Sequence, residues 1–152
     1  MNSLRLIKYW LPVCLWMLVI YWMSTGAFSS DNTSRIIEPL LYFLFPDISK
    51  ESVSAAHVFI RKMGHVTEYF VLGLLLFRAF RGTSQHQWNI RWAILAASAA
   101  AFYALTDEYH QSFVSTRTAS LSDVGIDSAG AVLSQLIVAL YCRWRTGRKS
   151  VL

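Results

Sequence analysis

Four long apolar stretches constrain this chain more than any other feature, because each is long enough to cross a lipid bilayer as a helix. Roughly 20 apolar residues in a helix span a bilayer core of about 30 Å, and the four stretches cover about residues 6–25, 59–80, 92–111 and 122–142. Only 15% of the 152 residues are charged, whereas a soluble domain carries about a quarter. The sequence therefore predicts an all-α polytopic membrane protein, in which one domain (residues 1–152) forms a four-helix transmembrane bundle.

The first apolar stretch has two interpretations. Arg5 and Lys8 precede its apolar core, and the residues at 25–27 are small, which is the pattern of a cleaved signal peptide. Its centre contains the bulky side chains of Trp16, Tyr21 and Trp22, which favours a retained helix. We expect the helix to remain in the protein.

Basic residues gather on one side of the predicted topology. Short cytoplasmic loops of membrane proteins collect Lys and Arg. Nine of the 14 basic residues, and none of the nine acids, lie at or beyond the ends of the stretches on one side of the predicted membrane: Arg5, Lys8, Arg78, Arg81, Arg91, Arg143, Arg145, Arg148 and Lys149. This pattern predicts a protein of the bacterial inner (plasma) membrane with cytoplasmic termini and with residues 26–58 and 112–121 outside. The positive charge is thus assigned to the membrane and not to nucleic acid.

The long outer segment contains its own apolar run, Ile36 to Phe45, with Pro39 inside it and Pro46 after it. Ten residues are too few to span a bilayer. The run therefore predicts a short interfacial or re-entrant helix in the first outer loop.

Ionisable residues are concentrated at the predicted outer ends of the spans. Such groups cost free energy in a bilayer and commonly mark functional sites. Spacings of three and four predict that His65 meets Glu68 on one helix and that Asp107 and Gln111 share a face on another. We predict three groups: a reactive centre of Glu68, His65, Asp107 and Glu108; two phosphate-positioning cations, Lys62 and Arg117; and supporting substrate-binding residues Gln111, Tyr69, Asp123 and Ser24.

Other interpretations of these residues stay open. The cluster could simply hold the helices together, and Asp123 could stabilise a helix N-terminus. His110 is expected at the rim, and His57 and His86 on the surface. The predicted site carries an excess of negative charge, which protonation of carboxylates or a divalent metal could balance. The sequence establishes no cofactor, and a divalent metal is the one candidate, with His65, Glu68, Asp107 and Asp127 as its candidate ligands.

Small residues predict close helix packing. Gly130 and Ser134 form a small-xxx-small pair, which lets helices approach closely. We expect packing within a monomer, with a homodimer as the alternative. Cys14 and Cys142 lie in apolar runs, where they act as apolar filler, with palmitoylation of Cys142 as the alternative.

The motifs resemble those of the VanZ-like integral membrane proteins. Lys62-x-x-His65-x-x-Glu68-Tyr69 precedes Leu72-Gly73, and Asp107-Glu108-x-x-Gln111 precedes Arg117, Asp123 and Gly130. Two positions depart from that pattern: Asp127 stands where the family often has Asn, and Ser134 where it often has Gly. The resemblance implies a small multi-helix membrane protein and a link to teicoplanin (glycopeptide) resistance.

The favoured function is recognition of an anionic lipid or a lipid-linked cell-envelope precursor, such as a polyprenyl phosphate, in an outward-facing polar pocket. If the protein also modifies its ligand, it is a membrane-embedded phosphate-ester hydrolase or transferase, with or without a metal. One alternative is a proton-coupled small transporter or lipid flippase, because Glu68 and His65 are residue types of proton relays. Another is a non-enzymatic accessory protein of envelope enzymes.

Overall fold

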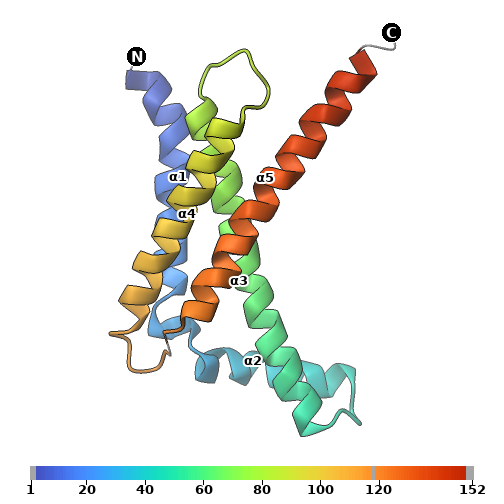
Figure 1. Cartoon of the computed structure of the whole chain (residues 1–152). Helices are drawn as coiled ribbons and strands as arrows, with labels where there is room; N and C mark the ends of the chain where they lie inside the picture. Colours follow the sequence, from blue (N-terminus) through green and yellow to red (C-terminus); the bar gives the residue numbers. More distant parts are fainter. Residues whose placement is uncertain (1–2, 118, 150–152) are drawn as a thin grey trace.

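The computed structural model describes residues 3–117 and 119–149, and it is all-α across that part of the chain (Figure 1). The elements are α1 (Ser3–Met23), the short 3-10 helix η1 (Gly26–Phe28), α2 (Ser30–Leu44), α3 (Lys50–Arg81), α4 (Ile90–Gln111) and α5 (Leu121–Lys149). The described residues form five α-helices and no strand, so the predicted fold class is confirmed at this level.

Helix α3 is the centre of the molecule. It packs against α1, α2, α4 and α5, and α4 also packs against α5. The start of α1, the α3–α4 connection and the end of α5 lie at one end of the molecule (Figure 1). Helix α2 and the α4–α5 connection lie at the opposite end, where α2 crosses the bundle.

Three described helices are long and apolar enough to cross a membrane: Leu4–Met23, Lys50–Arg81 and Leu121–Arg148. Helix α4 covers the expected third span but is not among them, because Arg91, Asp107 and Glu108 near its ends lower the hydropathy of a membrane-length segment. Large apolar side chains are exposed along these helices while carboxylates are buried between them. This inverts the usual pattern of a soluble protein, and it supports the predicted membrane protein.

Small residues bring the helices into close contact. A Cβ added at Gly130 would lie 2.5 Å from the carbonyl oxygen of Val66, and one added at Gly73 would collide with the Ser134 hydroxyl. Helix α4 contributes a face of fully buried alanines, Ala96, Ala100 and Ala104. The packing predicted for Gly130 and Ser134 therefore occurs within one chain, between α3 and α5.

Two helices begin earlier than predicted. Helix α3 starts at Lys50 and not near residue 59, because the hydroxyl of Ser49 caps it by accepting a hydrogen bond from the Ser52 amide at 3.2 Å. Helix α2 starts at Ser30 and not at residue 36, and it ends at Leu44, two residues before Pro46. The first turns of both helices are polar. The predicted helix boundaries rest on apolar residues, so these turns could not be recognised.

The expected surface position of His57 is wrong, whereas His86 is exposed as expected. Only 6% of His57 is exposed, because α2 covers this part of α3. His57 Nε2 lies 3.0 Å from the hydroxyl of Thr33 on α2, within hydrogen-bonding distance. This contact joins the crossing helix to the extended start of α3.

Candidate functional site

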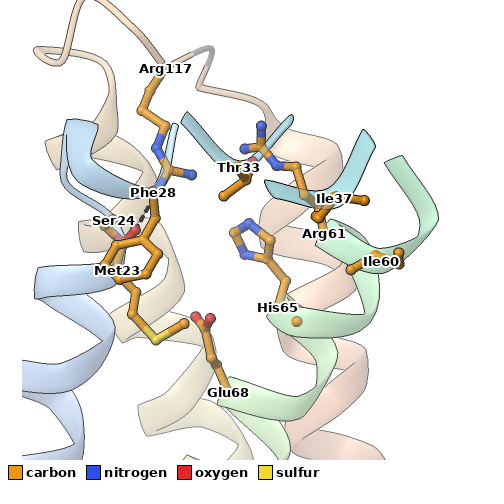
Figure 2. Close-up of a pocket in the computed structure, with 11 residues that line it drawn as sticks. Met23, Ser24, Phe28, Thr33, Ile37, Ile60, Arg61, His65, Glu68 and Arg117 are labelled. Carbon is orange, nitrogen blue, oxygen red and sulfur yellow. Dashed lines mark hydrogen bonds between the residues drawn. The ribbon is translucent and has the colours of Figure 1, made fainter. Parts of the chain in front are cut away.

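A cavity of about 170 Å³ lies near the α2 end of the bundle. It is bounded by the end of α1, by η1, α2 and α3, and by the α4–α5 connection (Figure 2). Polar and apolar side chains share its wall: Met23, Ser24, Phe28, Thr33, Ile37, Ile60, Arg61, Gly64, His65, Glu68 and Arg117. The cavity can therefore accommodate a polar group and an adjoining apolar one.

Two guanidinium groups face this cavity. Arg117 Nη2 donates to the carbonyl oxygens of Met23 at 2.5 Å and Thr25 at 3.2 Å, while its Nε is buried without a partner. Arg61 makes no hydrogen bond or ion pair with the residues that the structure describes. Burial lowers the pKa of Arg117 from its ordinary value, and nearby Arg61 lowers it further. Since arginine stays protonated in proteins, two cations lie here without a paired carboxylate.

Glu68 lies on the other side of the cavity from the two arginines (Figure 2). Its backbone carbonyl oxygen accepts a hydrogen bond from Trp16 Nε1 at 2.9 Å, which joins α1 to α3 at this level. Its carboxylate has no hydrogen-bond partner among residues 3–117 and 119–149 and is not sealed off by them. The carboxylate is therefore available to a molecule in the cavity.

His65 is held by an acid from α5. Its Nδ1 lies 3.1 Å from Asp127 Oδ1, and the Asp127 side chain is fully buried. When Nδ1 carries the proton and donates to Asp127, the lone pair of Nε2 is free. Nε2 has no partner in the described chain and is not enclosed by it. The sequence predicts that His65 meets Glu68, but its hydrogen-bond partner in the structure is Asp127.

Asp107 belongs to a network beside the cavity. The Ser24 hydroxyl donates to Asp107 Oδ1 at 2.5 Å, and Gln111 Nε2 donates to Asp107 Oδ2 at 3.1 Å. All three side chains are buried, but only Ser24 also lines the cavity. The network joins the end of α1 to the end of α4, and it accounts for the predicted shared face of Asp107 and Gln111.

The remaining candidate residues lie outside the cavity lining. Glu108 Oε2 accepts a hydrogen bond from the Ser120 amide at 2.8 Å, just before α5 begins. Asp123 lies in the first turn of α5, and Tyr69 is fully buried in the core. Lys62 is exposed and lines a separate shallow groove with Lys50 and other residues from the start of α3.

Arg61 is a cavity residue that the sequence prediction missed. The signal was present, because Arg61, His65 and Glu68 are four and three residues apart and share one helix face. Lys62, His65 and Tyr69 have the same kind of spacing. The spacing therefore does not determine whether Arg61 or Lys62 lies in the cavity with His65. The orientation of α3 against its neighbouring helices determines it.

The predicted metal ligands do not assemble into one centre. Among the residues that the structure covers, no three His, Cys, Asp or Glu side chains are placed to hold a metal ion. His65 contacts Asp127, whereas Asp107 is held by Ser24 and Gln111. These four residues therefore do not fit a metal site with three protein ligands.

The comparisons with known proteins identify a family. A family model described as VanZ/LLP1 matches residues 9–142, most of the chain. The chain therefore belongs to the VanZ/LLP1 family, which confirms the resemblance given by its motifs and suggests a membrane protein linked to glycopeptide resistance. No curated protein and no solved structure matches it.

Proposed function

We propose that this member of the VanZ/LLP1 family binds the phosphate group of a membrane lipid, or of a lipid-linked envelope precursor, in the cavity beside α3. The observation that carries the proposal is the pair of guanidinium groups, Arg61 and Arg117, which line one cavity without a carboxylate partner. Guanidinium groups form strong, charge-assisted hydrogen bonds with phosphate oxygens. Glycopeptide resistance would follow from binding of an envelope lipid.

The proposed topology places this cavity toward the outer leaflet. In this topology α4 crosses the membrane together with α1, α3 and α5, so that one domain forms a four-helix transmembrane bundle. Both termini face the cytoplasm of a bacterium. Helix α2 then lies in the outer interface. Support comes from the nine basic residues near the opposite end of the bundle. It also comes from the exposed apolar side chains of α4: Ile94, Leu95, Phe102 and Leu105.

The apolar part of the cavity favours a lipid over a free anion. Ile37 of α2 and Ile60 of α3 line it together with Met23 and Phe28, and Ile60 is also exposed on the outside of the protein. A lipid could place its phosphate near the arginines while its acyl chains stay in the bilayer.

Replacing Arg61 by glutamine tests the proposal. We expect Arg61→Gln to weaken retention of phosphatidylglycerol by about 10- to 100-fold, the effect of losing a charge-assisted hydrogen bond. Arg61 makes no hydrogen bond or ion pair within the described chain, so the melting temperature of the variant should equal that of the native protein. Native mass spectrometry of the purified full chain, titrated with the lipid, measures the binding.

Lys62→Gln is the matched comparison, because it removes the same charge one residue away. The sequence pattern predicts that Lys62→Gln loses lipid binding. The cavity geometry predicts instead that Arg61→Gln loses binding and that Lys62→Gln binds within about twofold of the native protein. Equal losses of binding in both variants would show that the lipid responds to the overall positive charge of the surface and not to the cavity. No loss of binding in Arg61→Gln would contradict the proposed site.

A second candidate function is hydrolysis of a phosphate ester, which the His65–Asp127 contact favours. A histidine oriented by a buried carboxylate can act as general base. Its Nε2 would take a proton from water as the water oxygen bonds to phosphorus. The ester P–O bond would then break, and the proton would pass to the leaving oxygen.

The hydrolysis candidate has its own test. We expect native protein to release the headgroup from a phospholipid in vesicles, and His65→Gln to lower this release at least about 100-fold, as expected when a general base is lost. Binding of the lipid should stay within about twofold. Phosphorus NMR measures the products, and absence of product with native protein would exclude hydrolysis of that lipid.

A further inference from the structure

The cavity contains one feature that phosphate binding leaves unexplained, the free carboxylate of Glu68. Glu68 pairs neither with His65, which is bonded to Asp127, nor with either arginine, since the one ion pair in the described chain joins His65 and Asp127. Figure 2 shows its carboxylate directed into the cavity from the side opposite Arg61 and Arg117. A carboxylate here repels a ligand that is only anionic.

Opposite charges on the two sides of a cavity complement a ligand that carries both charges. The arginines match a phosphate, and a carboxylate without a partner matches an ammonium group, which supplies three hydrogen-bond donors and a positive charge. The neighbouring cavity residue Gly64 offers no side chain to compete for Glu68, and a Cβ placed there would have no neighbour within 4 Å. Space for an additional ligand group is therefore present beside the helix.

The size of the cavity limits the ligand further. Its volume of about 170 Å³ is below the roughly 300–1,000 Å³ of pockets that enclose drug-sized molecules. A phosphate linked to a short amine needs less room than a lipid-linked glycan. The apolar residues Met23, Phe28 and Ile60 in the wall fit the glycerol and upper acyl segment of a lipid.

We propose that the ligand is an aminophospholipid, whose phosphate lies between Arg61 and Arg117 and whose primary ammonium group is bound by Glu68. This inference rests on the proposed phosphate-binding function and narrows it from phosphate-containing membrane lipids in general to zwitterionic lipids with a primary amine. The amine hydrogens matter as well as the charge, because a trimethylated ammonium group cannot donate hydrogen bonds to a carboxylate.

Competition between lipids tests the amine directly. The purified full chain in mild detergent is presented with equal amounts of phosphatidylethanolamine, phosphatidylcholine and phosphatidylglycerol, and the retained lipid is quantified by native mass spectrometry. We expect phosphatidylethanolamine to be retained at least about tenfold over each of the others. Equal retention of the three lipids would overturn the inference.

Glu68→Gln should remove this selectivity. The amide keeps the size of the side chain but loses its charge, so we expect the preference for phosphatidylethanolamine over phosphatidylglycerol to fall about tenfold, with retention of phosphatidylglycerol unchanged or higher. Glu51→Gln is the matched control, because Glu51 is an exposed acid in the first turn of the same helix and should leave the selectivity intact. Selectivity that survives in Glu68→Gln would also overturn the inference.

The same measurements separate this inference from the function on which it rests. If the three lipids bind equally and all are lost in Arg61→Gln, phosphate binding stands and the role of Glu68 is wrong. If none of the lipids is retained, the phosphate-binding function itself fails. Soluble 2-aminoethyl phosphate carries the same phosphate and amine as the lipid headgroup but has no acyl chains. If it displaces bound phosphatidylethanolamine only weakly, the ligand is a lipid. If it competes as strongly as the lipid does, the assignment to a lipid is overturned.

Discussion

Gly130→Leu is expected to prevent assembly of the folded bundle. A Cβ at this position would lie 2.5 Å from the carbonyl oxygen of Val66 and 3.1 Å from its Cα, and neither backbone atom can move without displacing α3. We expect a loss of stability at or above the upper end of the ~1–3 kcal/mol that overpacking usually costs. Thermal denaturation and the yield of monodisperse protein in detergent measure the effect.

Gly125→Leu provides the matched control on the same helix. Apart from its chain neighbours and the nearby backbone of its own helix, no atom lies within 4 Å of a Cβ built at Gly125, so we expect a melting temperature close to that of the native protein. A stable, monodisperse Gly130→Leu variant would show that α3 and α5 do not approach as closely as the structure has them.

The same close approach positions part of the candidate site. Gly130 follows Asp127 by three residues on α5, and its contact Val66 directly follows His65 on α3. Since both pairs lie at one level of the α3–α5 interface, a bulkier residue at Gly130 should also lengthen the 3.1 Å contact between His65 and Asp127. Packing and site geometry are therefore coupled through a single small residue.

The sequence was sufficient to predict features that depend on local composition. The apolar stretches, the small-residue pair at Gly130 and Ser134, and the shared face of Asp107 and Gln111 need no knowledge of neighbouring helices. The match over residues 9–142 agrees with motifs that can be read directly from the chain. These features follow from helix length and helix periodicity alone.

Features set by tertiary packing could not be predicted in this way. The polar first turns of α3 have no apolar signal, and His57 is buried only because α2 crosses over it. Helix periodicity places His65 equally well with Arg61 and with Lys62. The rotation of α3 against α1 and α5 resolves this ambiguity, and that rotation depends on contacts far apart in the sequence.

Arg117→Ala is expected to lower both ligand binding and stability, in contrast to Arg61→Gln. Arg117 supplies one of the two cavity cations, and it also joins the α4–α5 connection to the end of α1 through the carbonyl oxygens of Met23 and Thr25. An acceptor left without a partner costs about 1–3 kcal/mol. We therefore expect a clear drop in melting temperature together with a loss of lipid retention of about 100-fold.

Arg117→Lys separates the two roles of this side chain. A lysine keeps the positive charge but presents a single ammonium group, which lacks the planar fork of guanidinium. It cannot readily bond both carbonyl oxygens and still contact a phosphate, so we expect intermediate binding and intermediate stability. Thermal denaturation and native mass spectrometry, applied to both variants, give the comparison. If Arg117→Ala kept the native melting temperature and lipid affinity, Arg117 would have neither role, and Arg61 alone would be too little to define a phosphate site.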